Sequence, residues 1–471
     1  MAFPTDIIRI VGHYVVETFA DLELLFCTEW RQALTYPQAM ALVRLSVPNL
    51  FECVPRAVLS GVRQLAMESC SDKSLTRLVN VAPKLQDIDL GLCLELTSTE
   101  ALAQFQDLDT VRMQLCTSCS VFARGLTHLE LKGCSPISGD LSDLHTLKLH
   151  GCVIGDITHM NQDLRSLDLR DTHWSFRSSP LGWTLSQLHQ LTALRELKLS
   201  NCDIKNADAA GIAGMKDLHT LCINDCFSLN DFSFIKELPN LRVFSAPLDG
   251  FDWSLLQYLN LESLATRSNA DQLHMIATQP NLRSLSIRWW SHLFNSPDIS
   301  RILSALLSRL PLLHSLDVSN WSAVHDLPVH LGLRHLVVDN SFFLRDIELQ
   351  TLVRSFPHLV SLSLSRARIT DAGLALLNHT LQHLNISACQ ITNAGLRSLH
   401  QMTNLKSLDI SECDFITDCD PMLIPPSVEL LGLNNHGSMN YESWRSLRQR
   451  GVEVLDSKTL KARLAFGFIS N

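Results

Sequence analysis

The sequence predicts an α/β solenoid, with a curved parallel β-sheet on its concave face and short helices or 3₁₀ segments on its convex face. The first observation is a repeated phrase, L-x-x-L-x-L-x-x-C, which returns every 18–31 residues from about residue 62. The second is the alternation of leucines inside the phrase, which is the period of a strand with one buried face. The third is the wider apolar spacing after it, as in Ile369–Leu377, which is typical of a short helix.

One such unit is too small to bury its own leucines, so stacked units must bury them together. We count about eighteen phrases, which begin near Val62, Leu85, Leu108, Leu126, Leu144, Leu164, Leu194, Leu218, Leu241, Leu261, Leu282, Leu313, Leu333, Leu359, Leu381, Leu405, Val428 and Val452. The two steps of 18 residues between Leu108 and Leu144 leave little room for a helix, so we expect extended or 3₁₀ structure there. Two steps near 30 residues carry insertions.

The cysteines favour a column of buried thiols over disulfides. Nine of the fourteen occupy the last position of the phrase: Cys70, Cys93, Cys116, Cys134, Cys152, Cys202, Cys226, Cys389 and Cys413. Stacking places these equivalent positions side by side, where a thiol behaves as a small hydrophobic group. The N-terminus has no basic region followed by an apolar run, so we expect no secretory signal. Reduced thiols and a cytoplasmic or nuclear location follow as expectations.

The composition argues against several classes of function. The net charge of −9 comes without a block of Lys or Arg, which disfavours nucleic acid and anionic membranes as partners. No stretch approaches the ~18 apolar residues of a membrane span. The sequence contains no Gly-rich phosphate loop, no His-Glu-x-x-His and no Gly-x-Ser-x-Gly, so we expect a non-catalytic chain without a cofactor. Cys116 and Cys119 lack a second pair at zinc-finger spacing, so we expect no metal.

Two runs carry a family resemblance. They resemble the cysteine-containing subtype of leucine-rich repeats. That subtype places Cys at the last position of the phrase, here called the ladder position, and an Ile-Thr-Asp-x-Gly-Leu run near it. The two runs are Arg368-Ile-Thr-Asp-Ala-Gly-Leu374 and Cys389-Gln-Ile-Thr-Asn-Ala-Gly-Leu396. The resemblance covers more than four fifths of the chain and implies a leucine-rich repeat solenoid. The chain departs from the pattern between about 241 and 345, where Trp290 and Trp321 stand in place of Cys.

The first forty residues do not follow the repeat. They open with Phe3-Pro4-Thr-Asp6, continue with aliphatic residues and close with Cys27-Thr-Glu-Trp30-Arg31. Their apolar spacing predicts two short amphipathic helices, with Pro4 in a helix-start position. The segment resembles an F-box, which opens with Leu-Pro and an acidic residue and closes with Cys-x-x-Trp-Arg. Phe3 stands here in place of the usual Leu.

The resemblance implies the substrate-recognition subunit of a cullin-type (SCF) ubiquitin ligase, a monomer within a larger complex. The F-box would bind a Skp-type adaptor and the repeats would bind the target protein. The adaptor-facing residues would be Pro4, Ile7, Ile8, Val11, Leu25 and Trp30. Two alternatives stay open. The segment could only cap the first repeat, because solenoid ends need covering. The chain could also be a structural leucine-rich repeat subunit of a cytoskeletal, axonemal or other large assembly, with no ubiquitin role.

The expected organisation has four parts. Residues 1–45 form an F-box-like helical segment, 46–61 a connecting or capping segment, 62–456 the solenoid and 457–471 a C-terminal tail.

The third, fifth and seventh positions of each phrase should point out of the concave face. The fifth position begins Asp89, Arg112, Glu130, Lys148, Asp168, Lys198, so charges of opposite sign alternate between neighbouring strands. We expect cross-strand pairing on a solvated face, with protein binding as the alternative. Trp and Arg are enriched in binding hot spots, whereas Trp290 and Trp321 are expected to fill the core. The candidate partner-binding residues are Lys148, Asp168, Arg170, Trp174, Trp183, Arg288 and Trp289.

Overall fold

The structure is a computed structural model of the 471-residue chain. It describes residues 43–45, 62–67, 69–116, 119–121, 125–134, 137–171, 173–174, 185–202, 204–246, 251–266, 273–287, 299–320, 327–416, 420–433 and 441–464. The chain divides into two compact units, unit 1 (Met1–Asn240) and unit 2 (Leu241–Asn471), and each is described by itself.

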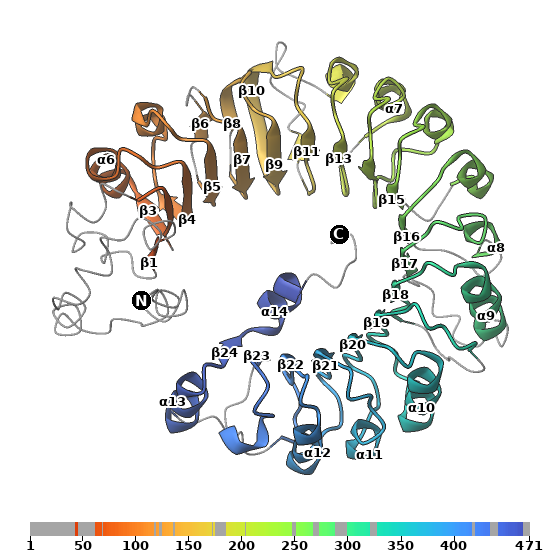
Figure 1. Cartoon of the computed structure of the whole chain (residues 1–471). Helices are drawn as coiled ribbons and strands as arrows, with labels where there is room; N and C mark the ends of the chain where they lie inside the picture. The colour runs from red at the N-terminus through yellow and green to blue at the C-terminus, as the bar shows by residue number, and fades with distance from the viewer. Residues whose placement is uncertain are drawn as a thin grey trace, which may run out of the picture. The chain divides into compact units, whose positions relative to one another are not determined.

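In unit 1 the repeated phrases form one curved parallel sheet (Figure 1). The strands pair in the order β1 (Val43–Leu45), β2 (Gln64–Met67), β4 (Asp87–Glu95), β5 (Thr110–Gln114), β7 (His128–Lys132), β9 (Thr146–His150), β11 (Ser166–Asp168), β13 (Glu196–Lys198) and β14 (Thr220–Cys222). A short strand β3 (Ser69–Ser71) also pairs with β4. The sheet therefore includes residues 43–45, which precede the first phrase at Val62.

The convex side of unit 1 changes where the repeats are shortest. A second parallel sheet runs there through β6 (Cys119–Val121), β8 (Ile137–Leu141), β10 (Val153–Met160) and β12 (His173–Trp174). This confirms the expectation of extended structure for the 18-residue steps. Longer repeats carry helical segments instead, namely α6 (Asp72–Val81), η1 (Glu100–Gln104), η2 (Leu185–Gln190), α7 (Asn206–Ile212) and η3 (Ser233–Glu237).

Unit 2 also has one curved parallel sheet, and its strands pair in chain order (Figure 1). They are β15 (Val243–Ala246), β16 (Ser263–Thr266), β17 (Ser284–Ile287), β18 (Ser315–Asp317), β19 (His335–Val337), β20 (Ser361–Ser363), β21 (His383–Asn385), β22 (Ser407–Asp409), β23 (Leu430–Gly432) and β24 (Glu453–Leu455). Phe244, Leu264 and Leu285 lie side by side in the region of irregular phrases, as the phrase starts at Leu241, Leu261 and Leu282 predict.

The convex segments of unit 2 are mainly helical. They are η4 (Trp253–Tyr258), α8 (Leu273–Ile276), α9 (Ile299–Arg309), α10 (Asp346–Ser355), α11 (Asp371–Leu374), α12 (Asn393–Ser398), η6 (Leu399–Gln401), η7 (Pro421–Leu423) and α13 (Tyr441–Gln449). The Thr370 hydroxyl accepts from the Ala372 N–H, and Thr392 caps the next helix in the same way. These contacts confirm the short helix predicted within Ile369–Leu377 and show that the next repeat begins its helix with the same kind of cap.

The core consists of columns of leucines and thiols. Leu129, Leu147 and Leu167 are neighbours in register and each is at most 1% exposed. All nine cysteines of the ladder position are buried and free, as expected. Several thiols donate to the carbonyl of the sixth position in the preceding repeat, for example Cys226 to Leu199 at 3.0 Å and Cys413 to Ile386 at 3.2 Å. A buried thiol thus supplies both volume and a weak donor.

The residue before the ladder position has a left-handed backbone in many repeats. Gly133 and Gly151 have φ of 61° and 60°, where glycine carries no steric cost. Ala388 adopts φ of 56° at the same place, a conformation that costs a side chain about 1–2 kcal/mol. The turn geometry of the repeat therefore imposes the conformation and the residue accommodates it.

The last phrase differs from the prediction. Leu431 lies beside Val454, whereas a phrase that begins at Val452 predicts Leu455 in that place. Within the described chain no further strand packs beyond β24, so Val454 and Leu455 are only half-buried and the hydrophobic pattern does not fix the register. The residues after this strand form helix α14 (Ser457–Leu464) within the segment expected to be a tail.

Candidate binding faces on the concave sheets

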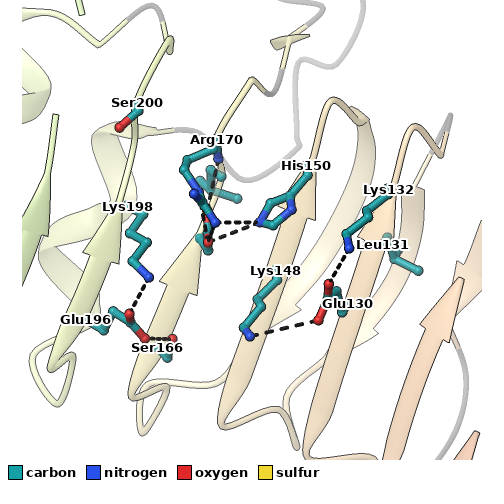
Figure 2. A network of polar contacts seen from close by, with 12 residues as sticks. Glu130, Leu131, Lys132, Lys148, His150, Ser166, Arg170, Glu196, Lys198 and Ser200 are labelled. Carbon is teal, nitrogen blue, oxygen red and sulfur yellow. Dashed lines mark hydrogen bonds and ion pairs between the residues drawn. The ribbon is translucent and has the colours of Figure 1, made fainter. Parts of the chain in front are cut away.

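The concave sheet of unit 1 carries a row of paired charges over β7, β9, β11 and β13 (Figure 2). Each carboxylate in this row has two donors. Glu130 pairs with Lys132 at 3.0 Å within its strand and with Lys148 at 3.9 Å across to β9. These contacts confirm cross-strand pairing, although part of the pairing runs within a strand.

Asp168 is the centre of the row. Its carboxylate accepts from Arg170 at 2.9 Å and lies 3.1 Å from Nε2 of His150 on the neighbouring strand. Burial acts to raise its pKa, but the hydrogen bonds from His150 and Arg170 outweigh burial and lower the pKa well below the ordinary value. Its side chain is 2% exposed, so the expectation of a solvated face is wrong at this residue.

Glu196 repeats the arrangement on β13. Lys198 Nζ lies 2.7 Å from its carboxylate, and the Ser166 hydroxyl donates to it at 2.6 Å from β11. Burial acts to raise the pKa of Glu196, but Lys198 and Ser166 together lower it. The row is therefore a preorganised surface in which each of these three carboxylates already has donors, while the Lys148 side chain stays 40% exposed.

The concave face of unit 2 is small, polar and buried. Fifth-position acids and amides accept from the N–H two residues later, as Asp317 does from Ser319 and Asp409 from Ser411, each at 3.0 Å. Asp168 makes the same local contact with the Arg170 N–H in unit 1. These side chains therefore shape the turn that ends the strand, which is a structural role. The buried serines of this face include Ser245, Ser284, Ser286, Ser315, Ser319, Ser361, Ser363, Ser365, Ser387, Ser407 and Ser411.

The structure brings Lys148 and Asp168 side by side on the adjacent strands β9 and β11, and Arg170, just after β11, pairs with Asp168. Trp174 lies on β12 of the second sheet, and its side chain is outside the described part. Trp183, Arg288 and Trp289 lie outside the described residues, as do Trp290 and Trp321. The adaptor-facing candidates Pro4, Ile7, Ile8, Val11, Leu25 and Trp30 also lie outside them.

The seventh position of the phrase has a role in the charged row that the sequence pattern was not used to predict. Lys132, His150 and Arg170 occupy the seventh position, and they supply donors to the fifth-position acids of their own or the adjacent strand. A signal was available, because basic residues recur at the seventh position of three neighbouring phrases.

The described residues give no support for a chemical centre. No group of three His, Cys, Asp or Glu side chains in the described ranges could hold a metal ion. Burial raises the pKa of the Cys93 and Cys413 thiols to about 12, so both stay protonated near neutral pH. Among the helices that the structure describes, none is long and apolar enough to span a bilayer.

Stacked leucines, parallel strands and convex helices together define a leucine-rich repeat solenoid, a class that generally provides a non-catalytic scaffold for binding proteins. A model of the Leucine Rich repeat family matches residues 357–377, 377–399 and 401–418 of this chain. Among curated proteins, no match is found.

Two solved structures are similar to this chain. One is a TLR13–ssRNA13 complex, at 17% identity over 84% of this chain and 58% of that chain, with a TM-score of 0.44. The other is an LRR protein of Leptospira interrogans, LIC12759, at 16% identity over 88% of this chain and 100% of that one, with a TM-score of 0.42. This chain covers only 58% of the TLR13 chain.

Proposed function

We propose that the chain is the substrate-recognition subunit of a cullin-type ubiquitin ligase. In this proposal the N-terminal segment binds a Skp-type adaptor and the repeats bind the target protein. The chain itself catalyses nothing and places the target within reach of the ligase.

The observation that carries the proposal is the order of two features along the chain. An F-box-like run from Pro4 to Trp30 comes first, and leucine-rich repeats follow it. The spacing of Pro4, Cys27 and Trp30 supports adaptor binding over a simple cap, because a cap requires only apolar helices. The repeat part supports the second half of the proposal, since it offers extended preformed faces to a protein partner.

The test is capture of a Skp-type adaptor by the full chain. We expect the wild-type chain to co-purify with the adaptor, and the double variant Pro4→Ala with Trp30→Ala to lose it. The matched control replaces two polar positions of the same segment, Thr5→Ala with Gln32→Ala, and should retain capture. Circular dichroism of all three chains checks that the repeats remain folded.

A wild-type chain that never captures the adaptor contradicts the ligase proposal. The alternative, a structural subunit of a larger assembly, then gains support. Equal capture by the double variant would contradict the assignment of Pro4 and Trp30 to the adaptor surface.

A further inference from the structure

Helix α14 leaves the repeat pattern and lies on the concave side of its own unit (Figure 1). Its central side chain, Leu460, is 1% exposed. The Leu460 Cδ2 atom lies 2.7 Å from where a Cβ at Gly432 would be. Gly432 is the last residue of β23 and the fifth of the phrase that begins at Val428, a position that faces the concave side. The missing side chain at Gly432 thus makes space for Leu460 and for the Asp409 carboxylate, whose Oδ1 atom lies 2.6 Å from the same point.

Two polar contacts extend from this apolar anchor. The Ser457 hydroxyl donates to Asp409 on β22 at 2.5 Å. Lys461 Nζ lies 3.6 Å from the Asp339 carboxylate, which follows β19. Together the contacts of α14 extend from β23 to the end of β19, so its footprint crosses several strands.

Lys461 brings a positive charge to an acidic part of the concave face. Burial raises the pKa of Asp339 and the neighbouring Asp317 raises it further, whereas Lys461 lowers it. Asp339 also accepts from the Ser363 hydroxyl at 2.6 Å and from the Ser365 N–H at 2.9 Å. Among the described residues, Lys461 is the cation that pairs with Asp339.

A second observation on the same face concerns polar groups that α14 does not satisfy. His335, Ser361, His383 and Ser407 are neighbours in register on four adjacent strands, and we call them the His–Ser row. Each has a buried side-chain atom without a hydrogen-bond partner among the described residues: Nδ1 of both histidines and Oγ of both serines. A buried group left unpaired costs about 1–3 kcal/mol.

We propose that the concave face of unit 2 binds a protein segment that carries a lysine or arginine, and that α14 is the intramolecular occupant which this segment displaces. The cation of the partner replaces Lys461 at Asp339. The proposal rests on the proposed function, in which the repeats bind a protein.

The size of the α14 footprint and the few contacts that fix the helix support its displacement by a partner segment. A footprint across several strands, at roughly 4.8 Å per strand, has the width of a polypeptide segment. It is too wide for a free metal ion. The helix has eight residues, and helices this short are marginal on their own. Leu460 is its one buried apolar anchor among the described side chains, so a longer segment with the same cation can compete.

The first test asks whether these contacts hold α14. Full-length Leu460→Asp and Lys461→Ala should exchange the amide hydrogens of α14 at least tenfold faster than wild type. Lys458→Ala is the matched control, because Lys458 lies on the same helix and is exposed. Unchanged exchange in both test variants overturns the proposal. Lys461→Ala keeps the test valid if Leu460→Asp does not fold.

The second test asks whether the vacated face accepts a basic segment. A labelled peptide of residues 456–464 should bind the Leu460→Asp chain at least tenfold tighter than wild type, because the tethered helix competes at a high effective concentration. Lys461→Ala in the peptide, or Asp339→Asn added to the chain, should abolish this gain, whereas Lys458→Ala in the peptide should not. Equal binding to wild-type and Leu460→Asp chains, or no dependence on Lys461, overturns the proposal.

The outcome is separable from the ligase proposal. Peptide binding without adaptor capture rejects the ligase and leaves this face as a protein-binding site. Adaptor capture without peptide binding rejects the occupant role of α14 and leaves the ligase proposal standing.

Discussion

At the scale of single residues, the charged row of unit 1 shows how a surface pattern becomes a buried contact. Asp168 lies under the side chains of His150 and Arg170, which are 23% and 18% exposed. Its carboxylate serves the turn after β11 and the pairing across to β9 at once. We therefore expect Asp168 to act on stability first and to affect partner binding through the positions of its neighbours.

Replacement of Asp168 by Asn should lower the free energy of unfolding by about 2 kcal/mol at neutral pH, because hydrogen bonds to a charged group are lost. The folded pKa lies below the ordinary ~3.9, so the carboxylate stabilises the fold above that pH. Its contribution fades as the pH falls through the lowered pKa. Urea unfolding between pH 7 and pH 2 should show the difference between the two chains shrinking. Asp163→Asn, at an exposed site of the same repeat, is the matched control and should leave the stability at neutral pH unchanged.

Ser361 offers the opposite case. Its hydroxyl is buried and unpartnered among the described residues, so Ser361→Ala should leave stability unchanged or raise it by about 1 kcal/mol. Ser363→Ala is the matched control, since its hydroxyl donates to Asp339, and it should be destabilising. Thermal unfolding of both variants measures the sign. A clear loss of stability in Ser361→Ala would contradict an unpaired hydroxyl.

At the scale of elements, an acidic side chain in one repeat caps the convex segment of the next. Asp371 accepts from the Thr392 N–H at 2.9 Å and from its hydroxyl at 2.6 Å, and Asp346 holds Thr370 in the same way. Asp72 and Thr97 repeat the contact in unit 1. The Ile-Thr-Asp and Ile-Thr-Asn runs seen in the sequence therefore encode a link between repeats as well as a cap within one.

Asp371→Ala should cost about 1–2 kcal/mol, since it removes a cap and two hydrogen bonds to the next repeat. Faster hydrogen exchange should appear in α12 as well as in α11. Asp414→Ala removes an exposed acid from a neighbouring loop and should change neither quantity. An effect confined to α11 would contradict the link between repeats.

Replacement of alanine by glycine should change stability in opposite directions at two positions, because only one of them has a left-handed backbone. Ala388→Gly should stabilise the chain by up to about 1 kcal/mol, because its φ of 56° strains an alanine. Ala394→Gly, in helix α12, should destabilise it by about 0.5–1 kcal/mol. Denaturant midpoints of the two variants should therefore shift in opposite directions. A shift of the same sign would contradict the strain at Ala388.

Elements were predictable where the local pattern and the stacking agree. The phrase starts predicted the register of Phe244, Leu264 and Leu285, and the 18-residue steps predicted extended convex segments. The pattern was wrong at β24, where no later strand buries one face. Helix α14 could not be predicted, because its position depends on contacts with Gly432 and Asp339, which lie far away in the sequence.

At the scale of the molecule, stability in a solenoid comes mainly from contacts between neighbouring repeats. The charged row of unit 1 also depends on contacts between neighbouring repeats. The sequence predicted which charges face the concave side, but the choice of partner depends on side-chain reach, as when Lys198 pairs with Glu196 of its own strand. The adaptor surface at Pro4 and Trp30 stays a prediction from the sequence.

Nearest-neighbour stabilisation predicts that damage stays local. Asp168→Ala should accelerate hydrogen exchange in β9, β11 and β13 of unit 1, whereas β20, β21 and β22 of unit 2 should keep the rates of the wild-type chain. Exchange followed by mass spectrometry measures both groups in one experiment. An equal increase in both units would show that the whole chain unfolds as one cooperative body.

The sulfur column has a consequence for how this chain can vary. Cys413 fills a closed space and also donates its hydrogen to Ile386. Alanine would leave a cavity and remove the hydrogen-bond donor. Serine would bury a strongly polar hydroxyl in an apolar site. Few side chains combine modest bulk, low polarity and a proton to share. Few substitutions are therefore tolerated at these cysteine positions. This restriction alone can preserve the recurring cysteine that marks each repeat in the sequence.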